Sequence, residues 1–195
     1  DGKYEPLSTP GVDTGMGLER MLVVINGLKD VYETDVFLPI INKIEELSKL
    51  EYGSKTDKEY IHKSKQCWVD VRKNFRIIAD HLKGAILLLN YNILPDKIGR
   101  GYITRRLIRR AVIQMKKINI PVEHNVVNKI TESFFGIYPE LNKKKKLILL
   151  ELEKEIIRFS ETLERGLKEF EKFKEKIDGE TAFKLFETYG FPIEL

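Results

Sequence analysis

Hydrophobic residues recur every three or four positions over most of this chain, the spacing that places side chains on one face of an α-helix. Residues 51–70 are the exception: they are polar and lack this periodicity, and we interpret them as a mobile connection or insertion. The pattern therefore predicts a mainly α fold. Helices are expected over residues 21–28, 34–47, 75–91, 96–117, 122–135, 149–177 and 181–189.

Several details of these helices are also predicted. Thr34 and Asp35 are the candidate N-caps of the second helix. Gly84 would allow close packing of a neighbour, for which we expect the helix over residues 96–117. The apolar spacing of residues 149–177 is typical of a core or coiled-coil helix. Residues 143–146 are four lysines near its N-terminus, where the macrodipole disfavours cations, so they are either a solvated run or an RNA contact.

Composition narrows the class of protein. The 195 residues include 42% hydrophobic and 33% charged side chains, as expected for a helix-rich globular protein of one or two domains. The single cysteine, Cys67, excludes a disulfide framework and a cysteine-rich zinc site and fits a reducing compartment. No apolar run approaches the ~20 residues that span a bilayer. We expect a cytoplasmic protein without a membrane partner, although an organelle protein would show the same pattern.

The predicted helix over residues 96–117 has a basic face. Its basic residues are Arg105, Arg106, Arg109, Arg110, Lys116 and Lys117, and the opposite, apolar face holds Ile103, Leu107, Ile108, Ala111, Val112 and Met115. No acidic residue stands between Lys97 and Lys117. The four arginines, called here the arginine cluster, repel one another unless an anion lies across them, and the planar guanidinium suits phosphate. The pattern favours a nucleic-acid backbone as partner over a merely solvated surface.

His81 lies in the strongly apolar segment 75–91. No second histidine or cysteine stands near it at the spacing of metal ligands, and a single histidine in such a helix is usually a hydrogen-bonded core residue. We therefore predict no zinc site.

Residues 12–21, VDTGMGLERM, place two glycines directly before a predicted helix. Glycines there let a ligand approach the backbone, and a helix N-terminus attracts anions. Gly15 and Gly17 alone would fit an ordinary turn, and the Glu19–Arg20 pair makes the pattern more specific. The segment GMGLER resembles motif 3 of the class II aminoacyl-tRNA synthetases, and the wider segment is similar to the alanine-specific members of that class.

Five later segments resemble the same family in the same order: FRIIADHL (75–82), GRGYITRRLIRRA (99–111), TLERG (162–166), DGETAF (178–183) and YGFP (189–192). The resemblance implies a small strand–helix remnant of an antiparallel α/β catalytic domain followed by a helical bundle. It assigns residues 1–50 to the end of the catalytic domain, residues 51–70 to a connection and residues 71–195 to a helical tRNA-recognition domain.

The resemblance also implies an activity. The parent enzyme would activate alanine with ATP and Mg²⁺ and attach it to tRNA(Ala). Arg20 would be the catalytic residue that clamps an ATP phosphate, and Gly15 and Gly17 would let the adenosine lie against the backbone. Asp13, with Gly15, would bind the α-ammonium end of alanine. Motifs 1 and 2 would precede Asp1, so we expect these 195 residues alone not to aminoacylate.

The family reads a G·U wobble pair in the acceptor stem, whose guanine 2-amino group is accessible in the wide minor groove of A-form RNA. It uses an Asn in the loop before Arg-Gly-Tyr and an Asp before Thr-Tyr-Gly-Phe-Pro. Here Glu187 replaces the Asp, and the loop 95–99 has no Asn, which leaves Asp96 as an acceptor. The residues expected to bind tRNA are Lys97, Arg100, Arg105, Arg106, Arg109, Arg110 and Glu187.

Two other functions fit parts of the sequence. A stand-alone helical RNA-binding module without ATP chemistry would explain the basic helix but leave residues 13–20 without a role. A protein-interaction module built on the apolar stripe of residues 149–177 would bind acidic proteins and show no salt-dependent affinity for RNA.

Overall fold

The computed structural model describes the chain except for residues 1, 3, 7, 54–57, 61–67, 123, 174–176 and 190–195. Helices make up nearly all of the regular structure in the described residues, so the predicted mainly α fold is confirmed. The chain divides into two compact units, residues 1–38 and 39–195. These units follow packing, and the functional division at residues 50 and 70 stays a prediction.

The first unit holds α1 (Leu18–Asn26) and the short 3-10 helix η1 (Val31–Glu33). α1 ends at Gly27, whose φ of 61° is a left-handed conformation that glycine adopts readily, and its N–H donates to the carbonyls of Val23 and Val24. The described residues before α1 form no strand. The strand expected before motif 3 is therefore not formed in this part of the chain, since a strand needs a neighbour to satisfy its backbone groups.

The helix predicted to start at Thr34 or Asp35 begins later, because α2 spans Leu38–Ser48. The carbonyl of Thr34 accepts the N–H of Leu38 at 2.8 Å. Its hydroxyl instead donates to the carbonyl of Val31 at 2.6 Å. Thr34 thus supports the start of α2 through its backbone, and the side-chain cap predicted for it is wrong.

The polar stretch 51–70 includes a short antiparallel hairpin that the periodicity did not predict. β1 (Lys58–Tyr60) pairs with β2 (Trp68–Asp70), with Glu59 opposite Val69. Strands of three residues are too short for an alternating pattern to stand out in the sequence. The residues that join the two strands lie outside those described, so the mobile connection proposed there stays a prediction.

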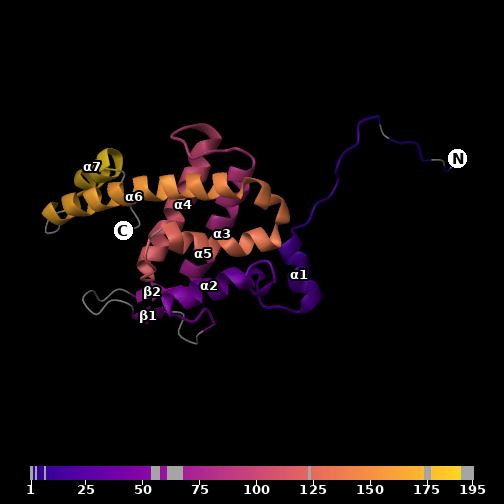
Figure 1. The fold of residues 1–195 in the computed structure, drawn as a ribbon, viewed down its shortest axis with the longest axis horizontal. Helices are drawn as coiled ribbons and strands as arrows, with labels where there is room; N and C mark the ends of the chain where they lie inside the picture. Colours follow the sequence, from indigo (N-terminus) through magenta and orange to yellow (C-terminus); the bar gives the residue numbers. More distant parts are fainter. Residues whose placement is uncertain are drawn as a thin grey trace. The chain divides into compact units, whose positions relative to one another are not determined.

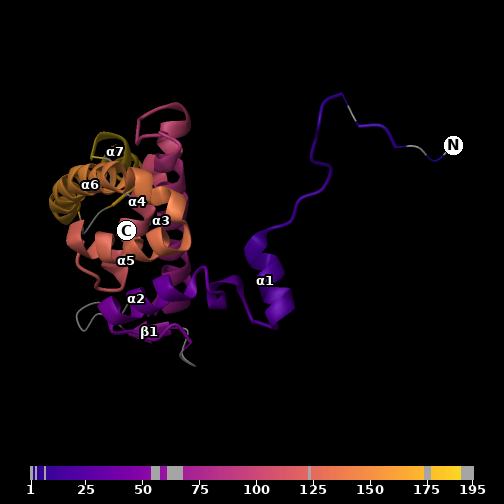
Figure 2. The same cartoon turned by 45° about the vertical axis from the view of Figure 1, so that its right-hand side comes forward.

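The second unit is built around α3 (Val71–Asn90) and α4 (Gly99–Lys117), which lie side by side (Figures 1 and 2). Asp70 caps α3 by accepting the N–H of Lys73 at 2.8 Å. A Cβ atom added at Gly84 would lie 3.3 Å from Cδ1 of Leu107, so a side chain there would crowd α4. The predicted packing of the basic helix against Gly84 is confirmed.

Three further helices complete this unit: α5 (His124–Ile137), α6 (Lys145–Phe173) and α7 (Gly179–Tyr189), with the 3-10 helix η2 (Pro139–Lys144) before α6. α6 packs against α4, and α7 lies along α6 (Figure 1). In the apolar stripe predicted over residues 149–177, the residues that are at most 2% exposed are Leu152, Ile156, Phe159 and Leu163. This part of the stripe is therefore core, covered by the chain itself.

Lys144 belongs to the lysine run 143–146, which was interpreted as either solvated or in contact with RNA. It has a structural role that neither interpretation predicted. Its Nζ donates to the carbonyl of Asn90 at 2.7 Å and to Oδ1 of Asn92 at 3.1 Å. Asn90 is the last residue of α3, where carbonyls lack an intrahelical partner and the macrodipole favours a cation. Lys144 therefore caps the C-terminus of α3 from η2.

Lys145 is also engaged within the chain. Its Nζ lies 3.3 Å from Oε1 of Glu132 and 5.0 Å from the ring centre of Phe135, both on α5. Lys143 and Lys146 are exposed. The two alternatives, a solvated run or an RNA contact, therefore apply only to these outer two lysines.

Replacing Lys144 with Ala should lower the free energy of unfolding by about 1–2 kcal/mol, because two oxygens at the end of α3 lose a charged donor. Its exposed neighbour supplies the control: Lys143→Ala should change that free energy by less than about 0.5 kcal/mol. Urea denaturation of both variants beside the unchanged chain measures the difference. Equal losses in the two variants would contradict the capping role.

Candidate active-site motif and nucleic-acid interface

The glycine motif leads directly into α1. Gly17 is the N-cap residue of α1, and no side chain caps the helix there. Arg20 lies in the first turn, with its Cγ and Cδ atoms 3.6 Å from the position of a Cβ at Gly17. Asp13 and Gly15 precede them on exposed chain without helix or strand structure. The structure thus brings Gly17 and Arg20 together at a helix N-terminus, an electropositive position that suits a phosphate.

The arginine cluster meets a carboxylate from α6. Glu155 is 4% exposed, and its Oε1 accepts a hydrogen bond from Nε of Arg109 at 2.6 Å. Nε of Arg105 lies 3.6 Å from the same oxygen. The guanidinium carbon of Arg109 is also 4.9 Å from the ring centre of Phe159, one turn further along α6. The mutual repulsion of the arginines predicted an anion beside the cluster. For Arg105 and Arg109 this anion is the carboxylate of Glu155, in the same chain.

The apolar face of α4 is as predicted at Ile108, Ala111, Val112 and Met115, which are at most 1% exposed, but differs at its first residue. Ile103, predicted to be core, is 48% exposed, and Thr104 is fully buried instead. The Thr104 hydroxyl donates to the carbonyl of Ile93 at 2.9 Å, which satisfies a polar group of the connection that precedes the helix. The prediction for Ile103 is wrong, because this hydrogen bond to a residue outside the helix, which periodicity does not reveal, favours burial of Thr104 in the first turn.

Arg110 faces α3 beside His81. Nε of Arg110 and Nδ1 of His81 are both buried, and neither has a hydrogen-bond partner among the described residues. Burial lowers the pKa of His81, the charges of Arg110 and Arg106 lower it further, and Asp80 acts in the opposite direction. The hydrogen bond predicted for His81 is therefore missing at Nδ1, and the imidazole favours its neutral form.

The loop before α4 is folded tightly onto the first turn of that helix. The N–H of Asp96 donates to the carbonyl of Gly101 at 3.1 Å, and Oδ1 of Asp96 accepts the N–H of Lys97 at 2.6 Å. A Cβ atom at Gly101 would stand 2.4 Å from the carbonyl oxygen of Leu94 and 2.7 Å from Cβ of Asp96. Only glycine fits this approach, and one oxygen of the exposed Asp96 carboxylate accepts a hydrogen bond from its own loop.

This loop, α4 and α6 enclose a recess of about 210 Å³, called here the basic recess. Its lining residues are Pro95, Asp96, Lys97, Arg105, Arg109, Glu155 and Arg158. Three predicted tRNA-binding residues therefore meet in one place. Glu155 and Arg158 were not predicted as site residues, although both stand close in sequence to Phe159 of the apolar stripe over residues 149–177.

The other predicted tRNA-binding residues lie outside the recess lining. Arg100 and Arg106 are exposed on α4, and Glu187 is exposed on α7. Asp178 caps α7 by accepting the N–H of Thr181 at 2.8 Å, and the hydrogen bonds from Thr181 hold the pKa of Asp178 below its usual value. Glu187 thus stands on a helix with a well-formed start.

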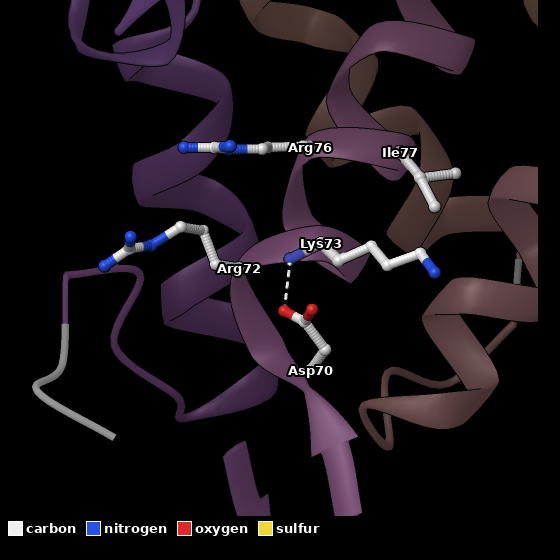
Figure 3. A pocket seen from close by; sticks show the side chains of 5 residues that line it. All are labelled: Asp70, Arg72, Lys73, Arg76 and Ile77. Atoms are coloured by element: carbon white, nitrogen blue, oxygen red, sulfur yellow. Dashed lines mark hydrogen bonds between the residues drawn. The ribbon is translucent and has the colours of Figure 1, made fainter. Parts of the chain in front are cut away.

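A second recess, of about 400 Å³, lies at the start of α3 and is lined by Asp70, Arg72, Lys73, Arg76 and Ile77. Figure 3 shows Arg72 and Arg76 extending to one side and Lys73 to the other. Nε of Arg76 donates to the hydroxyl of Tyr52 at 2.8 Å, and Asp70 serves as the helix cap. The basic side chains do not converge on a common point, so this recess is the weaker candidate for an anion site.

Among the residues that the structure describes, no helix is both long and apolar enough to cross a membrane. The same residues contain no cluster of three or more His, Cys, Asp or Glu side chains placed to bind a metal ion.

The whole chain is similar to one family of known proteins. The family described as "tRNA synthetases class II (A)" matches residues 1–195. Alanine–tRNA ligases of Dehalococcoides mccartyi, Borrelia hermsii and Lysinibacillus sphaericus are 39%, 39% and 40% identical over 201, 204 and 207 residues. Each match covers 100% of this chain but 22%, 32% and 22% of the relative. The resemblance drawn from motif 3 and the five later segments is confirmed.

Gly101→Ala should lower the free energy of unfolding by about 1–3 kcal/mol, because the added methyl group meets backbone atoms that cannot move aside freely. Gly136, inside α5, has no atom within 4 Å of its Cβ position. Gly136→Ala should therefore leave stability unchanged or raise it by up to about 1 kcal/mol. Chemical denaturation distinguishes these outcomes, and a Gly101→Ala variant as stable as Gly136→Ala would show that the loop is not tightly packed.

Stability should decrease as pH falls below the ordinary histidine pKa of 6.5. The pKa of His81 is lower in the folded chain, so the unfolded chain takes up a proton first, and acid favours unfolding until the folded pKa is also passed. In His81→Gln this contribution is absent, so the free energy of unfolding should fall less between pH 7.5 and pH 5.5 (about one pH unit on each side of the ordinary value). Urea titrations across this range measure the slope, and identical slopes would exclude His81 as the source.

Proposed function

Because this chain belongs to the class II (A) tRNA synthetase family, we propose that it forms part of an alanine–tRNA ligase whose acceptor-stem binding involves residues 39–195. The observation that carries the proposal is similarity along the full chain to enzymes of that name. The basic recess and the exposed arginines of α4 add a surface suited to RNA phosphates, which dominate the affinity of nucleic-acid binding.

The first unit would serve adenylate formation, in which the carboxylate of alanine attacks the α-phosphate of ATP and pyrophosphate leaves. Arg20 would bind an ATP phosphate at the N-terminus of α1, where backbone N–H groups also attract anions. Gly15 has no atom within 4 Å of its Cβ position and, with Gly17, would leave space for adenosine against the backbone. Asp13 would pair with the α-ammonium group of alanine. When bound, Mg²⁺ would supply charge neutralisation at the phosphates.

The second unit would read the acceptor stem. The carboxylate of Glu187 would accept a hydrogen bond from the guanine 2-amino group of a G·U pair. In a G·C pair this amino group is already hydrogen-bonded to cytosine. Arg100 and Arg106, exposed on α4, would contact phosphates and fix the position of the duplex. The remaining basic residues proposed to bind phosphate are Lys97, Arg105, Arg109 and Arg110.

Binding to an alanine-acceptor minihelix tests this function. The chain should bind a minihelix that carries G·U more tightly than one that carries G·C, with an affinity that falls as salt rises. Glu187→Ala should reduce that preference by about fivefold or more. Glu180→Ala, at an exposed position on the same helix, should retain it. Equal preferences in the two variants would remove Glu187 from the reading of the pair.

Arg106→Gln separates positioning from reading. It should weaken binding to both minihelices equally and reduce the slope of log affinity against log salt by about 1, because one phosphate contact is lost. A chain that binds neither minihelix would contradict the acceptor-stem function itself. A change in G·U preference on replacing Arg106 would show that this arginine contacts bases.

A further inference from the structure

We propose that the basic recess is a binding site for a single phosphate group of an RNA backbone, completed by Arg158 from α6 and organised by Glu155. The proposal rests on the acceptor-stem function and makes one site of it specific. It assigns a binding role to Arg158 and a positioning role to Glu155.

The charges in the recess do not balance. Four of its lining side chains are basic (Lys97, Arg105, Arg109 and Arg158) and two are acidic (Asp96 and Glu155), which leaves two positive charges in excess. Asp96 is bonded to the N–H of its own loop, and Glu155 is bonded to Arg109. Lys97 and Arg158 are exposed and form no ion pair with any described carboxylate. Cations gathered in this way repel one another until an anion enters.

Glu155 holds the inner arginines in place. Its bond to Arg109 uses Nε, one of five guanidinium donors, and the ring of Phe159 lies against the same guanidinium. The side chain of Arg109 is accordingly only 19% exposed, and that of Arg105 is 25% exposed. The 3.6 Å separation between Arg105 and Glu155 is too long for a hydrogen bond, so Arg105 keeps its donors for a ligand. Glu155 thus fixes the orientation of the Arg109 side chain. It attracts Arg105 electrostatically and forms no hydrogen bond with it.

Arg158 reaches the same recess from α6. It follows Glu155 by three residues, and residues at this spacing are neighbours on one helix face. The recess volume of about 210 Å³ leaves room for a phosphate group. Arg100 and Arg106 are exposed elsewhere on α4, outside the recess lining, and this further positive charge suits a polyanion better than a free phosphate ion.

The test is a minihelix in which each phosphate is replaced in turn by an uncharged methylphosphonate. At one linkage the replacement should weaken binding of the unchanged chain by about fivefold or more. The same replacement should leave the affinity of the Arg158→Gln variant unchanged. The salt slope of Arg158→Gln should also be smaller by about 1. The matched control is Lys168→Gln, exposed on the same helix outside the recess lining, which should respond as the unchanged chain does.

Glu155→Gln tests the positioning role. If the carboxylate only repelled the phosphate, its removal would strengthen binding, whereas loss of positioning should weaken binding at the same linkage as Arg158→Gln. Thermal unfolding of each variant confirms that it is folded. Stronger binding by folded Glu155→Gln would overturn the positioning role.

The remaining outcomes separate this proposal from the function on which it rests. If Arg158→Gln still prefers the G·U minihelix and responds to every linkage like the unchanged chain, the phosphate site is wrong and the acceptor-stem function stands. If the chain binds no minihelix, both are wrong. If inorganic phosphate alone raises the melting temperature through Arg158 and no linkage depends on that residue, the recess binds free phosphate and the RNA assignment is overturned.

Discussion

Glu155 supplies the negative charge that α4 lacks along its own sequence. A carboxylate that is almost fully buried costs several kcal/mol in lost hydration unless a cation and hydrogen bonds compensate it, and neighbouring arginines repel one another when no anion is near. Packing α6 against α4 relieves both penalties, since Arg109 donates to Glu155 and lies against Phe159. The arrangement of these two helices, and the recess between them, depends on this pair.

A second constraint acts at the other wall of the recess. Gly101 brings the first turn of α4 so close to Leu94 and Asp96 that no side chain fits between them. The loop can therefore follow only a narrow path, and Asp96 uses its carboxylate to hold that path through the N–H of Lys97. The resemblance to the synthetase family implies that, in those enzymes, an Asn in this loop reads the wobble pair. Here Oδ1 of Asp96, the residue that could replace that amide as an acceptor, already accepts the N–H of Lys97, and the proposed reading is assigned to Glu187.

The sequence predicted those features that depend on local spacing. Helices α3 to α7 and the contact between Gly84 and α4 followed from periodicity, because burial of one helix face repeats with the helix turn. Glu155 could not be found in this way, since its bond to Arg109 joins residues 46 positions apart. Ile103 was misplaced for a similar reason: Thr104 bonds to a carbonyl outside the helix. Of the candidate site, residue types and most positions were predictable, whereas the pairing between helices was not.

The cap that Lys144 places on α3 has a consequence for the rate at which a ligand can bind. Lys144 contacts Asn90 and Asn92 at the start of the connection to α4, and Gly101 packs on the end of that connection. The connection is thus secured at both ends, and its conformational entropy is lost when the chain folds rather than when a ligand arrives. The RNA proposed to bind at this face would then need no slow ordering of the loop, and its association rate would be set by diffusion and by the attraction between charges.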